Sequence, residues 1–350
     1  MGLSRREFAA MLFGASGGVA FPLLLKPWRS FRALGVEAAE QDPQDLYFRW
    51  LPLSERVWIA RGGGGNSLLY LGARGALAVD AKSFGLGRAL AREALAHGVA
   101  VTHLVVTHHH SDHSGGSEAF RGAVRLAHEN ARPRIVATAA ANLARGTAAL
   151  SALEGRLVES GASEAMVGEV RALRDEIHDL APRDFGPTRT FSNEEEIELG
   201  GVSALTRWVS QGHTDGDAHV YLPAENVLHC GDLLFHGRHP YVDVGAGATP
   251  RGWIRCIDAM LEHCDPDTVV IPGHGGATDR AGLETQRDYF RRLEAVVDRG
   301  LAEGRTREEI QAMKPDDLVD LDGGAEPLAR NLGIVYDEAV GAATPTDEPV

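Results

Sequence analysis

The chain has 350 residues and 44% of them are hydrophobic, so it is long and apolar enough to bury a sizeable core and is not intrinsically disordered. Its formal net charge of −14 at pH 7 gives a surface of the wrong sign for phosphate backbones, which argues against a nucleic-acid partner. These values predict one large domain with terminal additions.

Residues 1–38 differ in character from the rest of the chain. An arginine pair, Arg5 and Arg6, is followed by Phe8 and by a weakly apolar run over 9–25 that several glycines dilute. This order resembles a twin-arginine export signal, so we expect a periplasmic protein. Because the run approaches membrane-spanning length, an uncleaved leader that tethers the protein to the membrane is the alternative.

Runs of apolar residues, alternating or continuous, predict the strands of the first half. These strands cover residues 47–53, 56–60, 67–71, 76–79, 102–106 and 124–127. Helices are expected over 85–97, in a short stretch from Gly116 and in an alanine-rich segment beyond Asn130. Apolar positions at helical spacing predict a helical insertion over about 141–180, which packs on the core or serves as a lid or dimer surface.

The second half repeats the pattern more loosely. Its predicted strands cover residues 188–191, 202–209, 218–222, 226–229 and 269–271, and helices flank the last of them. We therefore predict an α/β fold in which two mixed β-sheets are sandwiched between helices, an αββα order, with a main domain over 45–290. A helical extension over 291–343 should contain helices at 306–313 and 326–340, before a disordered tail over 344–350.

The segment after the strand over 102–106 is rich in metal-ligand side chains. It places His108, His110, Asp112 and His113 in the spacing His-x-His-x-Asp-His, followed by a glycine pair. Neutral imidazoles and carboxylates are the groups that zinc-type cations bind. The alternative, an exposed polar loop that happens to be histidine-rich, does not explain why further ligand-type residues follow later strands.

Three such residues follow later strands. His213 lies in a turn-rich loop, Asp232 follows the strand over 226–229, and His274 follows the strand over 269–271. Since loops at strand ends bring distant residues together, these side chains can complete a site for two metal ions.

These residues make the chain resemble the metallo-β-lactamase-fold hydrolases over about residues 45–290. The resemblance implies that Asp232 bridges two metal ions and that Asp80, the early acidic residue of the family pattern, supports the metal loop from the second shell. The resemblance also implies two ligand sets. The first metal would be held by three histidines, His108, His110 and His213. The second metal would be held by an aspartate and two histidines, Asp112, His113 and His274.

The ligand chemistry agrees with this division. Three neutral imidazoles leave the first cation its full charge, which suits a Lewis acid that polarises a carbonyl. Asp112 and Asp232 make the second site harder, so iron or manganese would be tolerated there, although two zinc ions per chain are our first expectation. The predicted nucleophile is a hydroxide that bridges the ions, and Asp112 is the predicted catalytic residue because it can orient that hydroxide.

The resemblance implies a dinuclear zinc hydrolase that cleaves an ester, thioester, lactone or lactam bond in a small molecule. In the β-lactamases with a cysteine ligand, a lysine three residues later binds the drug carboxylate, whereas Asp232 and Phe235 occupy these places here. The bridging aspartate is similar to that of glyoxalase II and the lactonases of this fold. A true metallo-β-lactamase and a mononuclear iron persulfide dioxygenase of the same fold are the alternatives.

Four further side chains are candidates for the substrate pocket: His128, Arg238, His239 and Tyr241. For each of them, an ordinary structural role is the alternative. We expect His109 to lie outside the first shell, because side chains alternate in an extended segment. No structural disulfide is expected, and Cys230 is predicted to be a small buried core residue rather than a metal ligand.

Overall fold

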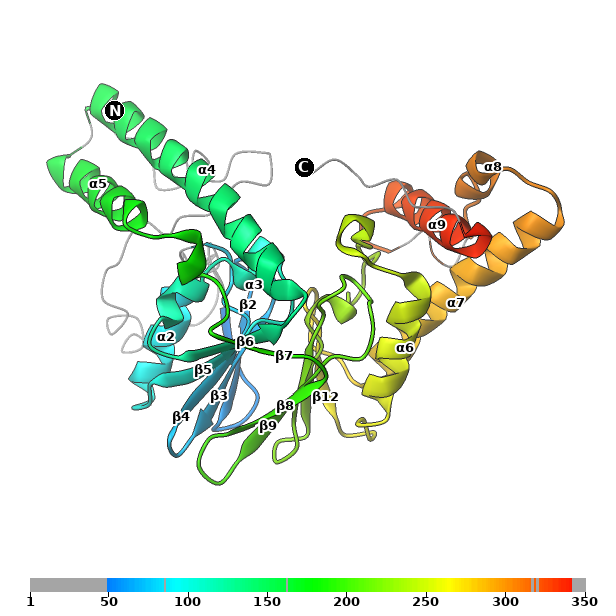
Figure 1. Ribbon diagram of the computed structural model, residues 1–350, viewed down its shortest axis with the longest axis horizontal. Coiled ribbons are helices and arrows are strands. Elements are labelled where there is room, and N and C mark those ends of the chain that lie inside the picture. The colour runs from blue at the N-terminus through cyan, green and yellow to red at the C-terminus, as the bar shows by residue number, and fades with distance from the viewer. Residues whose placement is uncertain (1–48, 85, 162, 316–317, 319–320, 342–350) are drawn as a thin grey trace, which may run out of the picture.

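Two mixed β-sheets face each other in the computed structural model, with helices on both outer sides (Figure 1). The structure describes residues 49–341 except for 85, 162, 316–317 and 319–320. The predicted export signal over 1–38 and the predicted tail over 344–350 therefore lie outside the described residues. The fold class predicted from the sequence is confirmed.

The first sheet has seven strands, which lie side by side in the order of the chain. They are β1 (Arg49–Pro52), β2 (Val57–Arg61), β3 (Ser67–Gly72), β4 (Gly75–Val79), β5 (Val101–Val105), β6 (Val124–His128) and β7 (Arg189–Phe191). The first four are antiparallel, and β4 to β7 are parallel. Parallel neighbours need a crossover, which α2 (Gly87–Ala96) provides between β4 and β5.

The second sheet has five strands in the order β12-β11-β10-β9-β8. They are β8 (Glu194–Glu198), β9 (Ser203–Arg207), β10 (His219–Leu222), β11 (Val227–His229) and β12 (Val269–Ile271). The sequence analysis assigned no strand to β8, because four of its five residues are glutamates. Ile197 is the one buried residue of this strand, so the apolar alternation that predicts a strand is too short to detect.

The inner faces of both sheets form one apolar layer. Leu68, Val79 and Val105 of the first sheet pack with Val220 and Ile271 of the second, and all five are at most 1% exposed. Every residue of β4 is buried, as expected for a strand covered on both faces.

Helices cover the outer face of the first sheet. α4 (Ala131–Glu159) and α5 (Glu164–His178) form a hairpin whose far end projects beyond the sheet (Figure 1). α4 combines the alanine-rich helix predicted beyond Asn130 with the first part of the predicted insertion, and Ala131, Ile135 and Ala139 at its start are buried against the first sheet's outer core.

The helices of the C-terminal part of the chain lie on the side of the second sheet (Figure 1). They are α6 (Pro250–Leu261), α7 (Arg280–Ala302), α8 (Arg307–Gln311) and α9 (Ala325–Val340). Leu228 of the sheet, Trp253, Phe290 and Leu332 belong to one buried cluster. This cluster shows that the C-terminal helices share a core with the second sheet. The domain boundary that the sequence analysis placed at residue 290 falls inside α7.

All three cysteines are buried and unpaired, and Cys230 belongs to the buried cluster beneath α6 and α7, as the sequence analysis expected. Among the residues that the structure describes, no helix combines the length and the apolar character needed to cross a membrane.

A run of four glycines joins β2 to β3 and lies against the histidine-rich segment. The Gly65 amide donates a hydrogen bond to the Asp112 carbonyl over 3.2 Å. Lys82, which is fully buried, donates to the Gly65 carbonyl over 2.6 Å and also to the Ala60 carbonyl. A Cβ at Gly65 would lie 2.0 Å from Cε1 of His113, so only glycine fits at this position.

We predict that Gly65→Ala destabilises the protein by about 1–3 kcal/mol, the usual range for overpacking. The His113 ring has no room to move, because it is fully buried and its Nδ1 lies 2.6 Å from Asp80. Urea unfolding measures the change in free energy. Gly122→Ala is the control, since nothing lies within 4 Å of its Cβ position. Equal stability of the two variants would contradict this packing.

Candidate metal centre

Seven histidine and aspartate side chains meet at the edge where strands of both sheets end. The chain leaves β5, β9, β11 and β12 at this edge, and the residues of interest follow these strands. Two groups of side chains have potential ligand atoms within 4.8 Å of one another: His108, His110, His213 and Asp232; Asp112, His113 and His274. The structure thus brings together all seven residues that the sequence analysis selected.

The first group contains three imidazoles around one carboxylate. Nδ1 of His110 lies 2.9 Å from Nε2 of His213. The carboxylate oxygen Oδ2 of Asp232 lies 3.5 Å from Nε2 of His213 and 3.8 Å from Nε2 of His108. These nitrogens converge on one small volume.

The second group surrounds the other side of the same carboxylate. Asp112 Oδ2 lies 3.2 Å from Nε2 of His274 and 3.6 Å from Nε2 of His113. Asp232 contacts this group too, with Oδ1 3.0 Å from Nε2 of His113 and Oδ2 3.3 Å from Nε2 of His274. Asp232 therefore faces both groups, which is the geometry required of a bridging ligand.

The second ring nitrogen of four histidines is held by a partner outside the two groups. These contacts are His108 Nδ1 with Thr107 Oγ1 at 3.0 Å, His113 Nδ1 with Asp80 at 2.6 Å, His213 Nδ1 with the Tyr241 carbonyl at 2.7 Å and His110 Nε2 with Asp243 at 2.8 Å. Such contacts fix the tautomer and the ring orientation of a metal-binding histidine.

Asp80 lies behind the second group. It is fully buried, its backbone φ is 61°, and it accepts hydrogen bonds from the Thr107 amide at 2.7 Å and the Thr107 hydroxyl at 2.9 Å. Together with the contact to His113, these bonds join β4 to the histidine-rich segment. Asp80 is thus placed to orient His113.

The charge states of the two groups differ. Burial is the main cause that lowers the pKa of His108 and His213, the latter to about 3, so both rings are neutral as metal ligation requires. Burial opposes the charge on His274, but the neighbouring Asp232 and Asp112 raise its pKa to about 9. Burial likewise opposes ionisation of Asp232, yet His113 and His274 lower its pKa well below the usual value. Positive charge is thus favoured between these carboxylates.

Buried polar atoms without partners indicate that a cation fits this site. Nε2 of His108, Nε2 of His113 and Oδ1 of Asp232 are buried and make no hydrogen bond, although the last two atoms lie 3.0 Å apart. Leaving such atoms unsatisfied is costly in a folded protein. Imidazole nitrogens and carboxylate oxygens at these spacings suit zinc-type divalent cations, so the residues present fit two such ions.

Of the four candidates for the substrate pocket, only Tyr241 lies beside the metal-binding groups. This residue is 43% exposed, and its ring centroid is 6.0 Å from those of His110 and His213.

The other three candidates make structural contacts instead. His128 is buried, with Nε2 bonded to the Ser192 carbonyl and Nδ1 to the Asn130 amide. Arg238 forms an ion pair with Asp322, and the buried His239 bonds to the Tyr289 hydroxyl. The structure thus does not bring these side chains to the two groups.

Sequence reasoning missed Asp243, which holds His110, and the glycine run beside His113. Asp243 lies in a loop without a recognisable spacing, so only the folded chain identifies it. His109 belongs to neither of the two groups, but it forms a third set with His110 and Asp243, whose potential ligand atoms also lie within 4.8 Å of one another. Its Nε2 lies 3.8 Å from Asp243.

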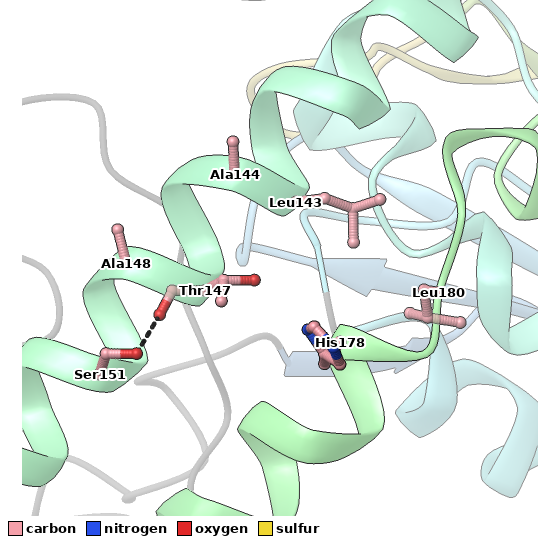
Figure 2. Close-up of a pocket in the computed structure, with 7 residues that line it drawn as sticks. All are labelled: Leu143, Ala144, Thr147, Ala148, Ser151, His178 and Leu180. Atoms are coloured by element: carbon pink, nitrogen blue, oxygen red, sulfur yellow. Dashed lines mark hydrogen bonds between the residues drawn. The ribbon is translucent and has the colours of Figure 1, made fainter.

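A groove elsewhere on the molecule carries no comparable chemistry. It lies between α4 and the end of α5, and Figure 2 shows the residues that line it: Leu143, Ala144, Thr147, Ala148, Ser151, His178 and Leu180. A single titratable side chain, His178, is among them, so this groove offers no set of metal ligands.

Comparisons with known proteins agree with the fold. Metallo-beta-lactamase type 2 of Bacillus cereus is 21% identical over 183 residues, which are 52% of this chain and 55% of that protein. The solved structure of the metallo-beta-lactamase from Pontibacter korlensis has a TM-score of 0.51 at 19% identity and covers 70% of this chain and 99% of its own. At this identity, the structural likeness concerns the fold alone.

An uncharacterized protein of Mycobacterium tuberculosis is 36% identical over 89 residues, 24% of this chain and 39% of that protein. The chain spans about half the length of the Bacillus relatives that it matches. Residues 60–274, which include all seven residues of the two groups, match the family model of the Metallo-beta-lactamase superfamily. This match covers more than half of the chain, which therefore belongs to the Metallo-beta-lactamase superfamily.

Proposed function

We propose that the protein is a dinuclear zinc hydrolase that cleaves an ester, thioester, lactone or lactam bond in a small molecule. The observation that carries the proposal is the position of Asp232, which faces a group of three histidines on one side and Asp112, His113 and His274 on the other. Superfamily membership supports a metal-dependent hydrolase.

When bound, two divalent cations at these groups would polarise the scissile carbonyl and lower the pKa of a water molecule. The protein contributes the orientation of the ligands. His110 and His213 are held by Asp243 and by the Tyr241 carbonyl, and His113 is held by Asp80. These contacts keep the rings in place before a substrate arrives.

Asp112 is the carboxylate that can reach the reacting water. Its side chain is 31% exposed, whereas that of Asp232 is 3% exposed. Burial opposes ionisation of Asp112, but His113 and His274 lower its pKa, so it stays an ionised hydrogen-bond acceptor. An acceptor at the open side of the site can orient the water for attack.

The surroundings favour esters, thioesters and lactones over β-lactam drugs. Phe235, which occupies the place of the drug-binding lysine, is 9% exposed and stacks on the His274 ring at 5.2 Å, so it offers no charge to a carboxylate. Tyr241 is 43% exposed, and its aromatic ring lies beside His110 and His213. An aromatic wall of this kind suits an apolar acyl group.

The iron dioxygenase alternative uses one metal ion. One of the two groups would then lack a cation, and the buried nitrogen of His113 or of His108 would stay without a partner. The cost of unsatisfied buried polar atoms therefore supports the two-metal hydrolase.

We predict that Asp112→Asn lowers kcat by roughly two orders of magnitude or more, because the amide orients water poorly and weakens the second cation site. Steady-state kinetics on the zinc-loaded protein measures the loss, and circular dichroism verifies the fold. Asp288→Asn on the exposed surface of α7 serves as the control for loss of a carboxylate. Unchanged turnover of Asp112→Asn would reject this role.

We also predict that the zinc-loaded protein hydrolyses aryl esters, thioesters or lactones with a higher kcat/KM than a chromogenic β-lactam, because Phe235 supplies no positive charge for the drug carboxylate. A panel of these substrates at one pH provides the comparison. The same preparation, loaded with iron, is tested for oxygen consumption with a persulfide. Oxygen uptake without hydrolysis of any panel member would favour the dioxygenase over the hydrolase.

A further inference from the structure

A four-residue segment outside the two metal-binding groups contacts two histidines of the first group. This segment, Pro240–Asp243, is called the strap here. The Tyr241 carbonyl accepts a hydrogen bond from Nδ1 of His213 over 2.7 Å. The carboxylate of Asp243 accepts one from Nε2 of His110 over 2.8 Å. The strap thus holds both rings whose facing nitrogens lie 2.9 Å apart.

The opposite side of the strap is held by α9. Asn331 donates a hydrogen bond to the Pro240 carbonyl over 2.9 Å, and Arg330 donates one to the Val242 carbonyl over 3.3 Å. The hydrogen-bond partners therefore alternate along the strap: residues 240 and 242 are bonded to α9, whereas residues 241 and 243 are bonded to the histidines.

Two more contacts fix this arrangement. The guanidinium of Arg330 lies 4.3 Å from the centroid of the Tyr241 ring, within the range of a cation–π interaction. Asn331 is 2% exposed and also donates to the Tyr289 hydroxyl over 2.9 Å, which connects α9 to α7. A buried amide with two partners is a rigid anchor, because its loss would leave the Pro240 carbonyl without this donor.

The second group is supported by other elements. His113 is held by Asp80 after β4, and the glycine run packs against it, with Gly65 bonded to Asp112 and Lys82. None of these contacts involves the strap or α9. A change in α9 should therefore reach the first group and spare the second.

We propose that Arg330 and Asn331 of α9 are positioning residues for the first metal ion, acting through the strap on His110 and His213. This inference rests on the proposed function, since it requires a cation at the first group. Residues outside the ligand shell typically change metal affinity by about 10- to 100-fold when they are replaced. The C-terminal helix would then be part of the metal centre, although it supplies no ligand.

The test compares metal binding by the full chain and its variants. Cobalt(II) is titrated against a competing chelator, and its visible absorption reports the coordination of each site. The His274→Ala variant retains the first group and assigns its signal. For Asn331→Ala and for Arg330→Met, we expect affinity at the first site to fall about 10-fold or more and its absorption to change. Affinity at the second site should stay within about twofold, since the second group has its own outer contacts.

Asp337→Asn is the matched control. Asp337 also lies on α9 and is buried, but it pairs with Arg307 of α8 over 2.7 and 2.8 Å and does not contact the strap. Its replacement should lower the melting temperature without changing cobalt affinity. Asp243→Asn, which alters the strap itself, should weaken the first site.

Three results would overturn the inference. In the first, Asn331→Ala and Arg330→Met bind both cations as the wild type does, while the wild type hydrolyses its substrate; the proposed function then stands alone. In the second, both affinities fall equally, which indicates a general loss of structure. In the third, the wild type binds no cation, which rejects the proposed function as well. Asn331→Ala and Arg330→Met remove different contacts to the strap. If one of them does not fold, the cobalt affinities of the other still test the inference.

Discussion

The structure is organised around one buried carboxylate. Asp232 is 4% exposed, and its oxygens lie 3.0–3.8 Å from Nε2 atoms of His108, His113, His213 and His274. An ionised carboxylate at this depth is stable only with compensating positive charge. Because Nε2 of His113 on one side and Nε2 of His108 on the other lack hydrogen bonds, the geometry suits cations on both sides of Asp232 better than it suits a network of protons.

Both sheets contribute side chains to the two groups that surround Asp232. The first sheet supplies His108, His110, Asp112 and His113 after β5, and Asp80 after β4; the second supplies His213, Asp232 and His274 after β9, β11 and β12. Each group has its own outer support, Asp80 with the glycine run for the second and the strap with α9 for the first. Two groups that face one shared carboxylate are thus held by independent parts of the fold.

The sequence predicts the parts of this account that have local signals. Apolar strands followed by ligand-type residues identified the sandwich and all seven side chains that now meet. β8 was missed, because a strand with one buried residue, Ile197, has no readable alternation. Asp243 and the anchors on α9 were missed because their partners lie far away in sequence. For the same reason, the sequence could not distinguish Tyr241, which lies beside the histidines, from His128, which does not.

The most direct test of the account is the location of metal in the zinc-loaded protein. Crystals measured above and below the zinc absorption edge would reveal each bound ion by anomalous scattering. We predict two peaks per chain, about 3.5–4 Å apart as in other two-metal sites, with the Asp232 carboxylate between them. A single peak, or two peaks that Asp232 does not bridge, would contradict the central role of this carboxylate.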